Sequence, residues 1–238
     1  MSKFYDEIAE HYDNIFPIKQ AQINFLLENL CKPTSKILDV ACGTGGYAIK
    51  LAEYGHLLTA IDLDSNMISE LQKKDNKIQS QVLNMLEIDQ LTNTFDLIYS
   101  LGNSIVHLDS FDLIEQFFHK CFLQLNHDGK LIIQIVNYDR ILAKEIKSLP
   151  TIHNATKHLS FVRNYQYLKE EQKLAFNTIL KVNNKSFENT VKLTPIQSFE
   201  LVKLLKNSGF KNIEIFGNFS KQIFNPLESM ACVIVASK

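Results

Sequence analysis

The chain has 238 residues, of which 45% are hydrophobic and 21% are charged, and its formal net charge is −1. This composition is typical of a folded globular protein and excludes a collagen-like or low-complexity chain. The near-zero charge lacks the basic stripe that usually marks a binder of nucleic-acid backbone, so a nucleic-acid partner is disfavoured.

The thiols are far apart and form no Cys-x-x-Cys pair: Cys31, Cys42, Cys121 and Cys232. We therefore expect no structural zinc and no other metal site, and scattered reduced thiols are typical of a cytoplasmic protein. We expect neither a signal peptide nor a membrane-spanning helix, because no apolar run is long enough. The oligomeric state is left open.

Strand-like apolar runs alternate with helical patterns up to Val136, which predicts a doubly wound, mostly parallel sheet. The predicted strands are Lys36–Val40, Leu57–Ile61, Ile78–Leu83, Phe95–Tyr99 and Lys130–Val136. The helices expected between them are Tyr47–Tyr54, Asn66–Lys74 and Phe111–Leu125. Gly55 is typical of the left-handed residue that closes a helix.

The pattern changes after Asn137. Three segments that alternate apolar and polar residues predict a three-stranded antiparallel insert within residues 147–194: Leu159–Leu168, Leu174–Val182 and Ser186–Thr194. Thr194, Pro195 and Gln197 then match the start of a capped helix, which Gly209 would end. Two last strands are predicted at Asn212–Phe216 and Ala231–Ala236.

A glycine-rich turn, Gly43-x-Gly45-x-x-Ala48, follows the first predicted strand and opens a helix. Glycine has no Cβ, so the backbone N–H groups of such a turn can approach a ligand closely. Asp62 lies at the end of the next strand, at the spacing where a carboxylate accepts hydrogen bonds from ribose hydroxyls. The pattern predicts a site for a cofactor that contains adenosine.

Two classes of cofactor satisfy this pattern. A dinucleotide such as NAD would place a pyrophosphate at the turn, whereas S-adenosylmethionine presents an ammonium and a carboxylate. Asp39, at the start of the turn, would repel a pyrophosphate and attract an ammonium. The residues therefore favour S-adenosylmethionine.

Four segments resemble the motifs of class I, Rossmann-like S-adenosylmethionine-dependent methyltransferases. They are Ile37–Gly46 (ILDVACGTGG), Ala60–Met67 (AIDLDSNM), Phe95–Ser104 (FDLIYSLGNS) with His107, and Leu125–Ile133 (LNHDGKLII). The resemblance covers about residues 5–136 and the C-terminal helix and strand pair. It implies one domain over residues 1–238, with a seven-stranded sheet whose final strand is antiparallel and with the 147–194 insert over the substrate side.

The resemblance also implies which residues bind the cofactor. Asp62 would bind the ribose, neighbouring apolar residues would flank adenine, and Asn84 stands where the family often has an aspartate for the adenine amino group. The full set is Tyr12, Asp39, Ala41, Gly43, Gly45, Asp62, Leu63, Met67, Asn84, Met85, Leu101, Asn103 and His107.

Some of these side chains also have a structural explanation. The helical spacing of Phe4, Ile8 and Tyr12 is explained by packing as well as by a lid over the cofactor. Asn84 could serve a loop hydrogen bond, and His107 a bond to a backbone carbonyl.

One strand of the insert has an aromatic face that carries a single guanidinium. Phe161, Arg163, Tyr165 and Tyr167 share this face by parity. The face could form a substrate pocket or pack against the core.

The loop Leu-Gly-Asn-Ser-x-x-His is similar to that of small-molecule N-methyltransferases related to glycine and sarcosine methylation. The resemblance therefore implies methyl transfer from S-adenosylmethionine to a nitrogen or oxygen of a small molecule. It names no catalytic residue. The alternatives are a tRNA or protein methyltransferase, an NAD-dependent oxidoreductase and a non-catalytic adenosine-binding module.

Overall fold

The computed structural model describes residues 3–238, with side chains from Ile8 onward. The strands of the larger sheet are β1 (Lys36–Val40), β2 (Leu57–Asp62), β3 (Gln79–Val82), β4 (Phe95–Ser100), β5 (Leu125–Val136), β10 (Lys211–Phe216) and β11 (Ala231–Ser237). Those of the smaller sheet are β6 (Ser148–Asn154), β7 (Leu159–Leu168), β8 (Lys173–Val182) and β9 (Lys185–Leu193).

The helices alternate with the strands. They are α1 (Lys3–Ile15), α2 (Gln20–Glu28), α3 (Gly46–Glu53), α4 (Ser65–Lys74), α5 (Phe111–Gln124), α6 (Tyr138–Ala143) and α7 (Ser198–Asn207). Short 3-10 helices form at η1 (Met85–Gln90), η2 (Ser104–His107) and η3 (Ala155–Lys157). None of the helices that the structure describes is long and apolar enough to cross a lipid bilayer.

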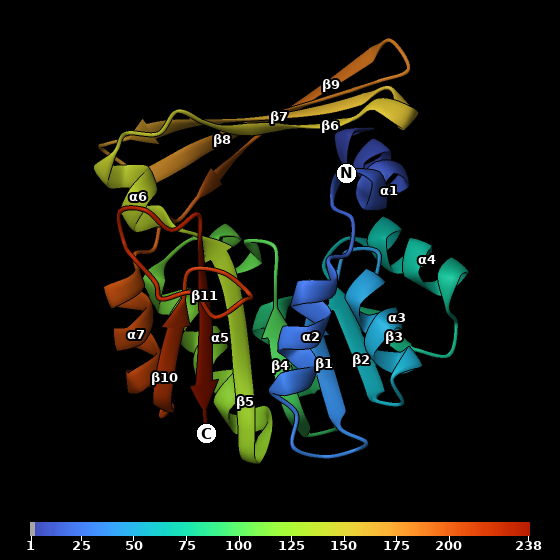
Figure 1. Cartoon of the computed structure of the whole chain (residues 1–238), viewed down its shortest axis with the longest axis vertical. Helices are drawn as coiled ribbons and strands as arrows, with labels where there is room; N and C mark the ends of the chain where they lie inside the picture. The colour runs from blue at the N-terminus through green and yellow to red at the C-terminus, as the bar shows by residue number, and fades with distance from the viewer. Residues whose placement is uncertain (1–2) are drawn as a thin grey trace.

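The larger sheet has seven strands in the order β10-β11-β5-β4-β1-β2-β3. The strands from β1 to β5 pair in parallel, and β11 runs antiparallel to both β5 and β10. The predicted mostly parallel sheet with an antiparallel final strand is therefore confirmed. Its five parallel strands place their carboxyl ends at one edge, and the smaller sheet lies across that edge (Figure 1).

Both faces of the larger sheet are buried, which explains the nearly continuous apolar runs of its strands. One apolar cluster joins Leu38, Ile98 and Ile133 to the helices α5 and α7. A second cluster on the opposite face packs Ile37 and Leu97 against α2, α3 and α4.

The first cluster also includes Tyr165, Leu174 and Leu193 of the smaller sheet. The apolar core thus continues from one sheet into the other.

The insert has four strands, so the predicted three-stranded sheet was wrong. The missed strand, β6, contains Pro150, which has no N–H to donate and is tolerated in sheets at edges and bulges. Accordingly, β6 is an edge strand, and its register with β7 shifts between Leu149 and Ile152.

The predicted cap of the C-terminal helix was also wrong. The helix α7 begins at Ser198 rather than beside Thr194, and Gln197 at its N-cap position makes no capping bond with its side chain. Thr194 instead ties the end of β9 to η2, because its Oγ1 donates to Leu108 O and its N–H donates to Val106 O. The N-terminus of α7 is capped from another helix by Asp139, whose Oδ2 accepts from Ser198 N at 2.9 Å. The predicted ends at Gly55 and Gly209 are confirmed by their φ angles of 89° and 102°.

We predict that Asp139→Ala lowers the free energy of unfolding by about 1 kcal/mol, because the first turn of α7 loses its cap. Urea unfolding would measure the change. Glu170→Ala, at an exposed acid in the turn after β7, is the matched control and should leave stability nearly unchanged. Equal effects of the two substitutions would contradict the capping role.

Candidate active site

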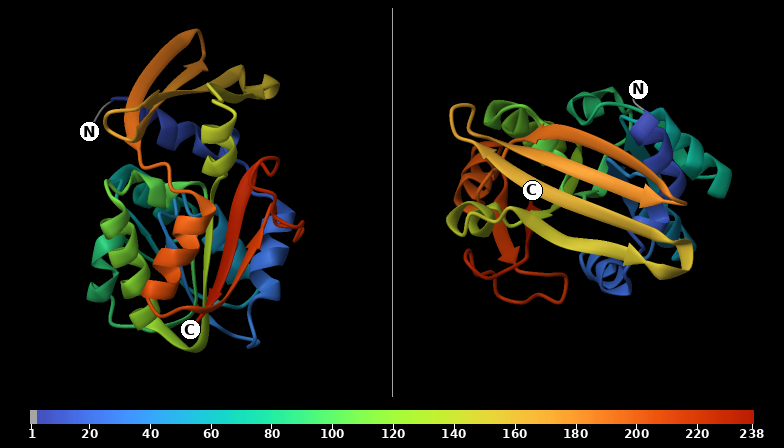
Figure 2. Two further views of the ribbon diagram at one scale, coloured as in Figure 1. Left: turned by 90° about the vertical axis from the view of Figure 1, so that its left-hand side faces the viewer. Right: turned by 90° about the horizontal axis from the view of Figure 1, so that it is seen from above.

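The carboxyl edge of the larger sheet is covered by two elements. The sheet β6–β9 spans the edge, and α1 lies under one end of it, as the view from above also shows (Figures 1 and 2). The helix α1 packs against α4 on one side and against β6, β7 and β9 on the other. The larger sheet's carboxyl edge therefore faces these two elements.

The glycine turn lies at this edge, packed between α1 and α4. Gly43 and Gly45 have φ angles of 54° and 73°, in the left-handed region that favours glycine. A Cβ on Gly45 would lie 2.2 Å from Leu71 Cδ1, and one on Gly43 would lie 2.8 Å from Tyr12 Cζ. Ala41 shares the left-handed conformation with φ 58°, which stores strain in the turn.

Asp62, at the end of β2, is held against this turn. Its Oδ2 accepts from Gly43 N at 2.8 Å, and its Oδ1 accepts from Asp64 N at 2.9 Å. Each oxygen keeps further acceptor capacity, so the carboxylate can still receive a pair of hydroxyl groups. Burial raises the pKa of Asp62, and the two backbone N–H donors oppose the rise. The neighbouring Asp64 caps α4 by accepting from Asn66 N, so the two acids have separate contacts.

Asp39, near the end of β1, is 3% exposed. Burial raises its pKa to about 7; a hydrogen bond from Tyr99 opposes the rise and the charge of Asp62 adds to it. The Tyr99 hydroxyl donates to Asp39 Oδ2 at 2.7 Å. The buried carboxyl group of Asp39 and the half-buried one of Asp62 thus concentrate negative potential at the turn, which favours a cationic ligand group.

Tyr12 is brought to the same place by α1. Its ring lies against Gly43, and its pKa is raised by burial first and then by the charges of Asp62 and Asp39. The helix is fastened beside it, because Asp13 accepts a hydrogen bond from Thr44 Oγ1 at 2.6 Å and forms an ion pair with Lys74.

The loop after β4 is tied to β5 and α6. Asn103 has φ 77°, its Oδ1 accepts from Val136 N at 3.0 Å, and its Nδ2 donates to the Tyr138 hydroxyl at 2.9 Å. The side chain of Asn103 is therefore engaged within the protein. Leu101 is buried, whereas His107 is exposed to solvent yet surrounded closely enough that desolvation lowers its pKa.

The residues expected around adenine differ in their exposure to solvent and in their contacts. Leu63, directly after Asp62, is 68% exposed and offers apolar surface at the edge. Asn84 Oδ1 accepts from Leu86 N at 2.9 Å, which is the loop hydrogen bond that its sequence position left open. Met67 is buried in the cluster that holds α1, and Met85 packs partly against the main core.

Sequence reasoning missed Tyr99 as the partner of Asp39. The parallel register of β1 and β4 places these two residues side by side, and hence on one face of the sheet. Comparing the parity of the two predicted strands would have found the pair once their register was known. Among the side chains that the structure describes, no cluster of His, Cys, Asp or Glu could hold a metal ion.

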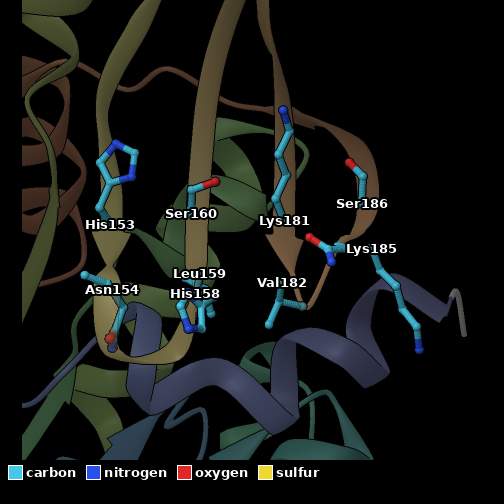
Figure 3. A pocket seen from close by; sticks show the side chains of 11 residues that line it. His153, Asn154, His158, Leu159, Ser160, Lys181, Val182, Lys185 and Ser186 are labelled. Atoms are coloured by element: carbon cyan, nitrogen blue, oxygen red, sulfur yellow. The ribbon is translucent and has the colours of Figure 1, made fainter.

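An open hollow of about 720 Å³ lies on the smaller sheet, at the end of that sheet next to α1 (Figure 3). His153, Ser160 and Lys181 line it from successive strands, and no residue of the glycine turn takes part. Its polar groups are exposed or half-buried, so it has the character of outer surface. The carboxyl groups of Asp39 and Asp62 identify the carboxyl edge as the candidate active site.

Comparison with known proteins agrees with this geometry. Residues 37–129, which contain the glycine turn and Asp62, match the family model of a methyltransferase domain. Residues 37–129 therefore resemble a methyltransferase domain, and the fold of the chain is that of a solved S-adenosylmethionine-dependent methyltransferase. The match supports the sulfonium compound S-adenosylmethionine as the cofactor, over the dinucleotide that the turn alone would also admit.

Two curated relatives and one solved structure illustrate the similarity. A glycine/sarcosine/dimethylglycine N-methyltransferase of Actinopolyspora halophila is 23% identical, with 93% of this chain and 40% of that protein covered. A glycine/sarcosine N-methyltransferase of Aphanothece halophytica is 25% identical, with 78% of this chain and 70% of the relative covered. A methyltransferase structure from Clostridium acetobutylicum has a TM-score of 0.81 at 18% identity, and 98% of each chain is covered.

The raised pKa of Asp39 makes the stability of the protein pH-dependent. Its carboxyl group is easier to ionise in the unfolded chain, so stability is lost as the pH rises through the folded pKa. We predict that Asp39→Asn raises the free energy of unfolding by up to about 4 kcal/mol near pH 8, and by roughly half of that or less near pH 5. Urea unfolding at the two pH values would measure this difference.

Asp96→Asn is the matched control, because its shift has the opposite sign. Burial raises the pKa of Asp96, but hydrogen bonds from Lys32, Lys36 N and Asn126 bring it below its usual value. This substitution should therefore destabilise the protein near neutral pH. A gain from Asp39→Asn that did not grow with pH would refute the assignment for Asp39.

Proposed function

We propose that the chain methylates a nitrogen or oxygen nucleophile of a small molecule, most readily an amine. The observation that carries this proposal is the cover of the carboxyl edge. The helix α1 and the sheet β6–β9 lie over the edge that carries Asp39 and Asp62, an arrangement suited to a compact acceptor rather than to a folded RNA or protein. The two relatives named as glycine and sarcosine N-methyltransferases support an amine as the acceptor.

Within this proposal, the cofactor is held by the turn and its neighbours. Asp62 accepts the two ribose hydroxyls, a role supported by the fixed orientation of its carboxylate on Gly43 N and Asp64 N. Asp39 faces the ammonium, and Leu63 offers its exposed apolar side chain to adenine. Tyr12 covers the methionine end from α1. The turn residues Ala41, Gly43 and Gly45 let the backbone approach the cofactor closely.

Asn84, Met85, Leu101, Asn103 and His107 complete the rim of the proposed site. Met67 acts from behind it by packing against α1.

The cofactor supplies a methyl group that its sulfonium already activates. The nucleophile's lone pair forms the new bond to carbon, the carbon–sulfur bond breaks with its electron pair on sulfur, and an amine proton leaves to water. The protein then has to align the acceptor, which can lower a barrier by roughly 7–11 kcal/mol. No strong base is required of the chain.

We predict that Asp62→Ala weakens binding of S-adenosylhomocysteine by roughly ten- to a hundredfold, because two hydrogen bonds to a charged group are lost. Isothermal calorimetry would measure the affinity. Asp64→Ala is the matched control: it removes the cap of α4 and should lower the melting temperature while leaving affinity almost unchanged. Unchanged affinity in folded Asp62→Ala would disprove the ribose role.

The acceptor class can be tested with labelled methyl transfer from S-adenosylmethionine. The protein would be incubated in parallel with a low-molecular-weight metabolite extract, with total tRNA and with a protein extract. We expect label in the small-molecule fraction. Label confined to tRNA or protein would overturn the proposed acceptor class and leave the methyltransferase assignment intact.

A further inference from the structure

The inner face of the smaller sheet has a polar row between two apolar areas. Arg163 on β7 pairs with Thr178 on β8, which pairs with Asn189 on β9, so the three residues form a row across the strands. Phe161 and Tyr165 flank Arg163 on the same face of β7 and are 3% and 5% exposed. The row therefore lies on the buried side of the sheet, toward the carboxyl edge.

The two apolar areas fix where this row lies. On one side, Phe161, Leu180 and Val182 pack with Ile8 and Ile15 of α1. The ring of Phe161 also meets that of Phe16, which follows α1, at 5.7 Å.

On the other side, Tyr165 and Leu174 belong to the core that they share with β4 and β5. Tyr165 stacks on Phe176 with ring centroids 5.2 Å apart. The polar row is thus held between α1, which carries Tyr12, and the ends of β4 and β5.

Two polar groups on this face are buried without a hydrogen-bond partner among the described residues: Arg163 Nε and the Tyr165 hydroxyl. Arg163 Nη2 donates to Pro150 O at 2.7 Å, which fixes the guanidinium at the bulge of β6. Burial raises the pKa of Tyr165 to about 12, and the Tyr138 hydroxyl, at hydrogen-bonding range, and then the charge of Arg163 offset part of the rise. The Tyr138 hydroxyl is engaged with Asn103, and its contact with the Tyr165 hydroxyl is not aligned as a hydrogen bond.

Within the described part of the chain, no ion pair joins Arg163 to an acid. The side chain of Arg163 is half-buried, but its Nε is fully buried, and buried donors of this kind are almost always hydrogen-bonded. The two groups therefore have the character of a recognition site for an anion.

The choice of arginine supports the same conclusion. Of the 25 basic residues (Lys+Arg), Arg140 and Arg163 are the two arginines, and every other position uses lysine. A guanidinium presents a planar fork of donors that matches two oxygens of a carboxylate or phosphate, whereas an ammonium acts as a point charge. Desolvation lowers the pKa of Arg163, and a neighbouring anion would counter this effect.

We propose that the methyl acceptor carries an anionic oxygen group, a carboxylate or a phosphate ester, which Arg163 and Tyr165 bind on the inner face of the smaller sheet. This inference rests on the proposed small-molecule function. The anion is anchored under the sheet, and the nucleophilic atom of the same molecule points to the methyl group at the carboxyl edge. Arg163 then determines which molecules are accepted.

The experiment compares paired acceptors with the wild-type protein and S-adenosylmethionine. Glycine and sarcosine supply a carboxylate and phosphoethanolamine supplies a phosphate; glycinamide, sarcosinamide and ethanolamine are their neutral counterparts. The metabolite extract, separated by anion exchange after labelling, extends the test to acceptors outside the pairs. We expect methyl transfer to an anionic acceptor, at least tenfold faster than to its neutral counterpart, and the productive member identifies the anion.

The same acceptor is then tested with Arg163→Met, Arg163→Lys and Tyr165→Phe. Arg163→Met should raise KM for the acceptor by roughly ten- to a hundredfold with a smaller change in kcat, and Arg163→Lys should recover part of the loss. Tyr165→Phe, which removes only the hydroxyl, should raise KM less. Affinity for S-adenosylhomocysteine should be the same in every variant. Lys181→Gln, which removes a positive charge from an exposed position of the same sheet, should behave as wild type.

Other results would overturn the inference in distinguishable ways. A neutral acceptor used as well as its anionic counterpart, or an unchanged KM in folded Arg163→Met, would refute the anion site while the proposed function stands. Failure of the wild type to label any pair or any component of the extract, with S-adenosylhomocysteine still bound, would refute the small-molecule function itself.

Discussion

The close approach of a buried carboxyl group, Asp39, and a half-buried one, Asp62, at the ends of neighbouring strands governs the candidate site. Burial raises the pKa of both Asp39 and Asp62, and the charge of Asp62 adds to the rise at Asp39. The fold offsets this cost with directed donors: Tyr99 for Asp39, and Gly43 N and Asp64 N for Asp62. A site arranged in this way is poorly suited to a pyrophosphate and well suited to a cofactor with a positive charge.

The same constraint explains why the turn has its particular form. Gly43 N can reach Asp62 because the chain turns in the left-handed region immediately after β1. That turn also brings Gly43 against Tyr12 and Gly45 against Leu71, so the site, α1 and α4 are packed as one unit. Asp13 completes the unit by joining α1 to Thr44 and Lys74.

Most of the larger sheet was predictable because its strands are buried on both faces and read as apolar runs separated by turn residues. The positions of Asp39 and Asp62 followed from the same pattern, since each lies where a run meets a turn. The edge strand β6 was not predictable in this way: it is half-exposed and contains Pro150, so neither apolar alternation nor propensity indicates it. The cap of α7 was equally unpredictable from the sequence, because Asp139 lies 59 residues before Ser198 in the chain.

The structure shows which of the predicted site residues are already hydrogen-bonded within the protein and which have unpartnered polar atoms. Asn84 and Asn103 are polar residues at strand ends, as a cofactor site requires, but their carbonyl oxygens already accept from Leu86 N and Val136 N. Sequence alone cannot distinguish such bonds from ligand contacts, because both need the same residue type at the same position. Arg163 is the reverse case: its parity with Phe161 and Tyr165 was readable, but the lack of partners for its Nε became visible only once the surrounding elements were in place.

The connections of the smaller sheet also determine how its cover over the site is supported mechanically. Both connections run through one side, where Thr194 is bonded to η2 and Asp139 joins α6 to the start of α7. The opposite end has no covalent support and is held by α1, through the Phe16–Phe161 contact and a bond from Asn154 Nδ2 to Asn14 O at 3.2 Å. The smaller sheet is thus attached through the chain at its α6–α7 side and by non-covalent contacts at its α1 side. Loss of the contacts with α1 would therefore release one end of the cover and leave the chain connections at the other end intact.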